Sequence, residues 1–70
     1  MDGQYTVRVN GADLELDEPM NLRTLLEREG YDLGRVAVEK NGKIVPKAKF
    51  GDEPLTGGDR LEIVTFVGGG

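Results

Sequence analysis

The feature that most constrains the fold is the dipeptide Asn10-Gly11, which stands between two short runs of alternating apolar and polar residues. A two-residue type I′ turn needs positive φ at both central residues, so this dipeptide predicts a tight β-hairpin. The short loop also fixes the register, which pairs apolar residues on one face of the hairpin: Val9 with Ala12, Val7 with Leu14 and Tyr5 with Leu16. On the other face Arg8 lies opposite Asp13 and Thr6 opposite Glu15, so turn chemistry and side-chain pattern agree.

A second hairpin is predicted around Asn41-Gly42, between residues 35–40 and a shorter run that Pro46 ends. A two-residue loop would set Lys40 opposite Lys43 and turn Ile44 outward. Because like charges that face each other destabilise a sheet, a longer loop or a bulge stays open as the alternative.

One helix is predicted over residues 22–29. Asn21 can cap its first turn, and Gly30 suits the position after its last. Three leucines at positions i, i+3 and i+4 form its apolar stripe: Leu22, Leu25 and Leu26. A helix of this length does not persist alone, so we expect it to lie on the apolar face of a sheet.

The last part of the chain predicts one more strand. Residues 48–55 are expected to form an irregular segment or a single helical turn, anchored by Phe50 and Leu55. Residues 57–59 mark a tight turn, and residues 60–67 are expected to form an apolar strand.

The predicted order is therefore strand, strand, helix, strand, strand, strand. The first and last strands are the most apolar, and the last has no hairpin partner nearby in the sequence. A mixed five-stranded sheet packed on one main helix, with the last strand parallel to the first, satisfies burial most simply. This is the α+β architecture called the β-grasp, or ubiquitin-like, fold. We expect a β-grasp domain over residues 1–67 and a flexible C-terminal glycine tail at residues 68–70. The expected core comprises Tyr5, Val7, Val9, Leu14, Leu16, Leu22, Leu25, Leu26, Val36, Val38, Val45, Leu55, Leu61 and Ile63.

The residue types that are missing limit the chemistry of this chain. Its 70 residues include no Cys, no His and no Ser, which leaves no common nucleophile–base pair and no thiolate metal ligand. Adjacent carboxylates such as Asp52 and Glu53 could in principle act as an acid–base pair, but a chain this short encloses no cleft that would raise one pKa. We therefore predict no catalytic residue, no metal and no bound cofactor, and a chain that is not an enzyme.

The charge balance bears on the partners. Nine Lys and Arg against thirteen Asp and Glu give a net charge of −4, without the basic stripe typical of nucleic-acid binders. No apolar run is long enough to span a bilayer, and the start of the chain does not resemble a signal peptide. A cytoplasmic protein that meets a basic patch on another protein is the expectation. Four lysines gather in one stretch and are expected to form a solvated hairpin rather than a site for an anionic partner: Lys40, Lys43, Lys47 and Lys49.

The chain closes with three glycines, Gly68, Gly69 and Gly70. A glycine run costs backbone entropy to order and adds no packing, so stability does not explain it. It suits a terminal carboxylate that must pass through a narrow channel to be activated, because glycine has no Cβ to clash there. A fraying end, or a remnant of cloning, is the alternative.

Four apolar side chains are expected to point outward beside this tail, where an activating enzyme would dock: Ala37, Ile44, Val64 and Phe66. A few exposed apolar residues are also ordinary on any protein surface.

Three segments carry a family resemblance: VEKNGKIVP at 38–46, LTGGDRLEIV at 55–64, and the closing FVGGG. They resemble the ThiS family, the bacterial sulfur carriers of thiamine biosynthesis. The resemblance implies that a ThiF-like enzyme uses ATP to adenylate Gly70, with Gly69 as its required neighbour. A sulfur donor protein would supply the thiocarboxylate sulfur, which passes to a ThiG-like thiazole synthase. Many relatives end in two glycines, so the resemblance assigns no role to Gly68.

Other functions fit the same residues. The small subunit of molybdopterin synthase (MoaD-like) and sulfur carriers for other acceptors share this fold and chemistry. A ubiquitin-like interaction module without covalent chemistry is the alternative from a different class. A single sequence separates the sulfur carriers poorly, because their partner enzymes choose the acceptor.

Overall fold

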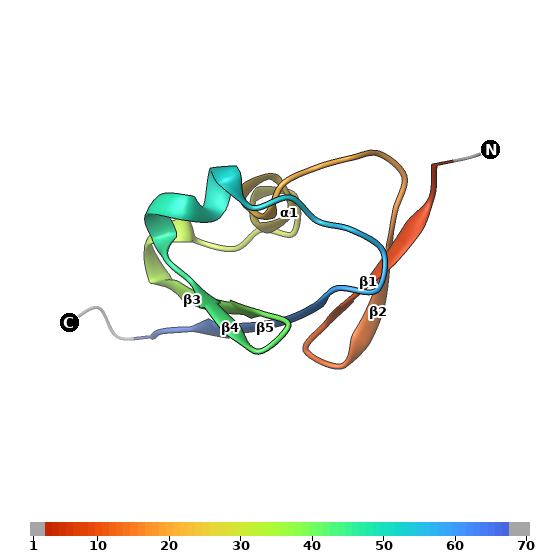
Figure 1. Cartoon of the computed structure of the whole chain (residues 1–70). Coiled ribbons are helices and arrows are strands. Elements are labelled where there is room, and N and C mark those ends of the chain that lie inside the picture. Colours follow the sequence, from red (N-terminus) through yellow and green to blue (C-terminus); the bar gives the residue numbers. More distant parts are fainter. Residues whose placement is uncertain (1–2, 68–70) are drawn as a thin grey trace.

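The computed structural model describes residues 3–67, which form a five-stranded sheet with a single α-helix against one of its faces (Figure 1). The elements follow the chain as β1 (Tyr5–Val9), β2 (Ala12–Leu16), α1 (Leu22–Arg28), the 3₁₀ helix η1 (Leu33–Arg35), β3 (Val36–Lys40), β4 (Lys43–Val45), the 3₁₀ helix η2 (Lys47–Asp52) and β5 (Arg60–Thr65).

The strand order in the sheet is β2-β1-β5-β3-β4. β5 runs parallel to β1 and antiparallel to β3, and both hairpins are antiparallel. The predicted mixed sheet on one helix, the β-grasp, is confirmed. Its last strand lies at the centre, between the two hairpins.

Both hairpins use two-residue loops. Positive φ angles at Asn10 (50°) and Gly11 (87°) give the predicted turn, and every residue pair of the first hairpin is as predicted. The second turn has the same conformation at Asn41 (54°) and Gly42 (85°). Its strands pair without a bulge although Lys40 faces a second lysine, so the longer loop left open by the sequence does not form.

The helix begins as predicted and ends one residue earlier, at Arg28. The Asn21 side chain accepts a hydrogen bond from the backbone N–H of Thr24 at 2.9 Å, which satisfies one free donor of the first turn. Gly30 follows with a φ of 82°, and Tyr31 donates back to the carbonyl of Leu26 at 2.9 Å.

The core lies between the sheet and the helices. Its buried apolar side chains are Val7, Leu16, Leu22, Leu25, Leu26, Val36, Val38, Val45, Phe50, Leu55, Leu61 and Ile63. Phe50 and Leu55 serve as the predicted anchors of the segment before β5.

Three residues predicted for the core, Tyr5, Val9 and Leu14, are only partly buried. They belong to the β1–β2 hairpin, in which β2 is an edge strand with a neighbour on one side alone. The hairpin extends past α1 in Figure 1, so the helix covers only part of its inner face.

β5 was predicted to reach residue 67, but it ends at Thr65. Thr65 pairs with Val36, the first residue of β3, so no further partner strand is available. One more backbone bond joins Phe66 N–H to the carbonyl of Arg35 at 2.7 Å. Within residues 3–67, no helix has the length and apolar character needed to cross a membrane.

Candidate functional site

The candidate site is the outer face of the sheet together with the end of β5, which leads to the C-terminus. Two backbone ladders hold β5: β1 pairs with Arg60 and Leu61, and β3 pairs along the strand as far as Thr65. Figure 1 shows that β5 carries the chain out of the sheet on the side away from the β1–β2 hairpin. The three glycines predicted to carry the chemistry, Gly68, Gly69 and Gly70, lie outside the described residues.

The asparagines of the two turns extend these ladders with their side chains. Asn10 Nδ2 donates to the carbonyl of Ile63 at 3.1 Å, and Ile63 N–H donates to Asn10 Oδ1 at 2.7 Å. On the other side Arg60 N–H donates to Asn41 Oδ1 at 2.9 Å. Each carboxamide thus takes the place of a strand neighbour that the hairpin does not supply. The local sequence pattern does not predict these bonds; their signal in the sequence is that both turns begin with Asn.

Three apolar residues on the side of the sheet opposite α1, together with the exposed Phe66 just beyond β5, form what we call the docking face: Ala37, Ile44, Val64 and Phe66. The exposed fraction is 75% for Ile44, 56% for Val64 and 55% for Phe66, so their predicted outward orientation is confirmed. Ala37 pairs with Val64 across β3 and β5. That this surface binds a partner stays a prediction.

A shallow groove of about 190 Å³ crosses the docking face. Its apolar lining comes from Ala37, Ile44 and Val64, and Val38 also borders it. Two carboxylates complete the lining, Glu39 and Glu62. Phe66 lies two residues beyond Val64, at the end of the sheet.

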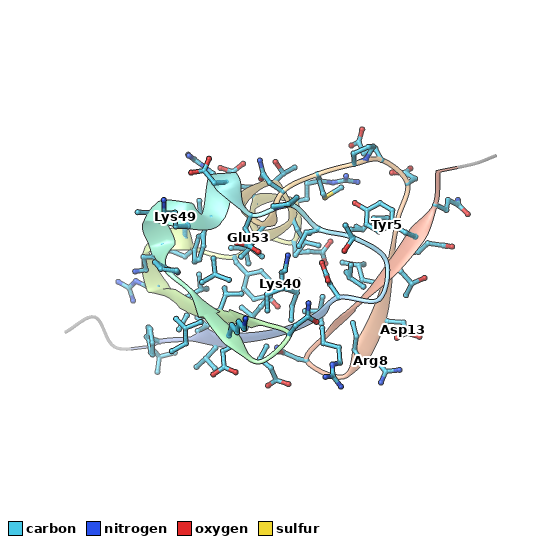
Figure 2. All side chains as sticks on the ribbon, viewed as in Figure 1. Tyr5, Arg8, Asp13, Lys40, Lys49 and Glu53 are labelled. Carbon is cyan, nitrogen blue, oxygen red and sulfur yellow. The ribbon has the colours of Figure 1, made fainter. Side chains whose placement is uncertain are left out.

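Lys40 corrects the prediction of a solvated lysine cluster. Its side chain is only 17% exposed, on the inner side of the sheet, and it lies beneath the segment that holds Glu53 (Figure 2). Lys40 Nζ is 2.8 Å from Glu53 Oε2 and donates to the carbonyl of Pro54 at 2.9 Å. The hydrogen bond to Glu53 outweighs partial burial and raises the pKa of Lys40 above its ordinary value. The other three lysines of the cluster are exposed, as expected.

Asp59 is a charged residue that is buried within the described part of the chain, with an exposed fraction of 7%. Its carboxylate accepts hydrogen bonds from Asn41 Nδ2 at 2.9 Å and from Thr56 N–H at 2.8 Å, and Lys40 Nζ lies 3.7 Å away. Burial alone would raise the pKa of Asp59, but these hydrogen bonds and the Lys40 charge together hold that pKa below its ordinary value. The network fastens the turn before β5 to the second hairpin.

Within residues 3–67, no group of three potential metal ligands comes together. The titratable groups with shifted pKa values, Lys40 and Asp59, bind each other and their neighbours. Asp59 also borders a shallow pocket of about 290 Å³, beside Arg8, Asp13 and Arg60. The arrangement can present a face and a chain end to another protein.

The ThiS family model matches residues 6–70 of the chain. A crystal structure of the thiamine biosynthesis protein ThiS from Geobacter metallireducens superposes with a TM-score of 0.78 at 31% identity, covering 93% of this chain and 99% of that one. Among curated proteins, ycf40 of Pyropia yezoensis is 35% identical over 65 residues, 93% of this chain and 92% of its own length. A thiazole synthase of Paramagnetospirillum magneticum is 42% identical over 62 residues, which are 89% of this chain.

The chain spans only 19% of the length of that thiazole synthase, so the match concerns one segment of a larger protein. The family match and the Geobacter structure, by contrast, extend over nearly the whole chain and agree with the observed strand order. The chain therefore belongs to the ThiS family.

Proposed function

We propose that the chain is a sulfur carrier, and that the carboxylate of Gly70 is the group that carries the sulfur. The observation that supports this most is the family match, which runs through residue 70 and so includes the glycine end. The absence of Cys, His and Ser from the sequence supports a cosubstrate that other enzymes act on, because the common nucleophiles and bases are missing.

The chemistry follows from the inertness of a carboxylate. A ThiF-like enzyme would use ATP to convert the Gly70 carboxylate to an acyl-adenylate, with release of pyrophosphate. A persulfide sulfur of a donor protein would then attack the acyl carbon and displace AMP, which leaves the chain joined to the donor as an acyl disulfide. A thiol reductant would cleave the S–S bond of that acyl disulfide, releasing the thiocarboxylate and forming a disulfide with the donor thiol. This chain binds no cofactor in the scheme; ATP belongs to the partner enzyme.

The domain contributes recognition and position. The docking face includes Val64 of β5 and Phe66 just after it, on the part of the chain that leads to the tail, so an enzyme bound there would hold the terminus close to its nucleotide. Gly68 and Gly69 would pass through the enzyme's channel without side-chain clashes. Such positioning makes the attack of the carboxylate on ATP effectively intramolecular.

Thiazole formation is the proposed destination of the sulfur. Two relatives named thiazole synthase contain a segment that matches 89% and 91% of this chain, which supports thiazole synthase as the acceptor enzyme. A MoaD-like role in molybdopterin synthesis is the alternative within the same chemistry.

Intact-mass measurement tests the proposal. The chain is incubated with a ThiF-like adenylating enzyme, ATP and a sulfur donor protein, and then weighed. We expect a mass increase equal to the replacement of one oxygen by sulfur, and no change when ATP is omitted. An unchanged mass in the complete mixture would contradict the sulfur-carrier proposal and favour a non-covalent ubiquitin-like module.

The substitution Phe66→Asp tests the docking face. We expect affinity for the adenylating enzyme to fall about tenfold or more, because a large apolar contact beside the end of β5 is replaced by a charge. The thermal midpoint should change little, since Phe66 is 55% exposed and lies after the end of β5. Calorimetry and thermal unfolding measure the two effects.

The matched control is Thr65→Asp, which adds the same charge one residue earlier, with the side chain directed to the other face. This control should bind within about twofold of the original chain. Equal losses in the two variants would show that added charge, and not the apolar face, decides binding.

A further inference from the structure

The groove that crosses the docking face is also lined by two glutamates that oppose each other. Glu39 of β3 and Glu62 of β5 are cross-strand partners, so their Cβ atoms lie about 5 Å apart. Both side chains are exposed, and neither forms an ion pair with any residue between 3 and 67. Arg60, two positions before Glu62 on the same face, does not neutralise them.

Opposed like charges weaken a sheet, so this pair does not serve the isolated fold. The same face of the sheet also contains a cross-strand pair of charges that stabilises the fold. Arg8 lies opposite Asp13 in the first hairpin and binds it at 3.2 Å. Arg8 also lies beside Arg60 on β5, but the ion pair with Asp13 already neutralises the charge of Arg8. Glu39 and Glu62 have no such compensation.

We propose that Glu39 and Glu62 together receive one arginine side chain of the adenylating enzyme, and that this contact decides which protein the docking face accepts. The inference rests on the proposed function. A guanidinium is planar and presents several donors, so it can bind two neighbouring carboxylates at once. Its apolar stem fits the groove that Ala37, Ile44 and Val64 line.

Charge complementarity supports this occupant over an uncharged one. The chain carries a net charge of −4, and the two glutamates concentrate negative charge within an otherwise apolar groove. An apolar side chain placed there would leave two carboxylates desolvated without partners, which is unfavourable. A bound cation removes the repulsion between the two carboxylates. Because that repulsion destabilises the free domain, its removal makes binding more favourable.

The test compares the original chain with the double variant Glu39→Gln/Glu62→Gln. The matched control is Glu15→Gln/Glu29→Gln, which removes the same charge from two exposed glutamates outside the groove. Binding to a purified ThiF-like adenylating enzyme is measured at several salt concentrations, and thermal unfolding is measured on each free chain.

We expect the double variant to bind about tenfold more weakly, with a smaller dependence on salt. Its thermal midpoint should rise by about 1–5 °C, because the repulsion is gone. Weaker binding in a more stable chain is a result that a structural role for the glutamates would not give. The control should bind within about twofold of the original chain.

Three results would overturn the inference. Unchanged affinity in the double variant, or an equal loss in the control, would remove the specific role of this pair while the sulfur-carrier proposal stands. A lower thermal midpoint would show that the glutamates serve the fold. Failure of the original chain to be adenylated would overturn both proposals, and it is seen without any variant.

Discussion

A chain extended by one alanine after Gly70 is expected to lose sulfur loading almost completely while its folding stays unchanged. The extra residue moves the reactive carboxylate by about 3.5 Å and places a Cβ in a channel suited to glycine. A misplacement of about 1 Å can already cost a factor of about 100 in rate, so we expect loading to fall at least that far. The measurement is the yield of the sulfur-substituted mass after a fixed reaction time.

A second chain separates the two causes of that loss. Conversion of the Gly70 carboxylate to a primary amide keeps every residue and nearly the same size, but removes the group that attacks ATP. The amidated chain should still bind the adenylating enzyme through the docking face and should gain no sulfur. Loading of either chain at the original rate would show that the reactive group lies elsewhere.

An alanine placed before Met1 is the control for the extension. It adds the same residue at the other end of the sequence, and both loading and thermal midpoint should match those of the original chain. Because the three glycines are consecutive, deleting any one of them gives the same product, which ends in two. Deletion therefore reports on tail length and not on Gly70 alone.

The parts of the fold that the sequence predicts well are those that local chemistry decides. The conformation of Asn10-Gly11 depends on two adjacent residues, and it then fixes all five pairs of the first hairpin. The same holds for the helix, whose start follows from the Asn21 cap and whose buried side follows from leucine spacing. Neither needs knowledge of a distant segment.

The side-chain bonds of Asn10 could not be predicted in this way. They exist because β5, more than 50 positions later in the chain, passes the end of the first hairpin. A turn asparagine has the same local conformation with or without that neighbour. Likewise, β5 ends at Thr65 because β3 begins at Val36, a limit set by its partner strand and not by the apolar residues that follow.

The docking face and its groove combine features that local sequence determines with features that depend on a distant strand. Strand alternation places Val64 and Ile44 outward, so their exposure is predictable from the sequence. The opposition of Glu39 and Glu62 is not, since it needs the register between β3 and β5, which no turn connects. Sequence patterns therefore find the apolar part of this surface and miss its charged part.

Lys40 shows why a run of charged residues in a sequence does not predict that each of them is exposed. It stands in a stretch of lysines, but it shares the inward-facing alternation of Val36 and Val38, which brings it beneath the turn before β5. The residues that neutralise it, Glu53 and Asp59, approach only when that turn folds over β3. These contacts join segments that are distant in the sequence. Burial of the lysine charge is unfavourable without them, because an unpaired charge loses its hydration.

The substitution Asp59→Ala is expected to destabilise the domain by about 2–3 kcal/mol at neutral pH, because hydrogen bonds to a buried carboxylate are lost and their donors stay buried. Urea unfolding measures the loss. Asp52→Ala, which removes an exposed carboxylate from η2, is the control and should lie within about 0.5 kcal/mol of the original chain. A similar loss in both variants would show that net charge, and not the Asp59 network, is responsible.

The effect of Asp59 should also depend on pH, with a sign that follows from its pKa. Hydrogen bonds and Lys40 hold the pKa of Asp59 below its ordinary value of 3.8, so the folded state favours the charged form more than the unfolded state does. The stability from this group is therefore fully present above the ordinary pKa and is lost as the pH falls through the folded one. The difference in unfolding free energy between the original chain and Asp59→Ala should be constant from pH 5 to 7 and should shrink as the pH falls below about 4. A difference that persists unchanged to the lowest pH at which the chain folds would mean that the carboxylate contributes through packing and not through its charge.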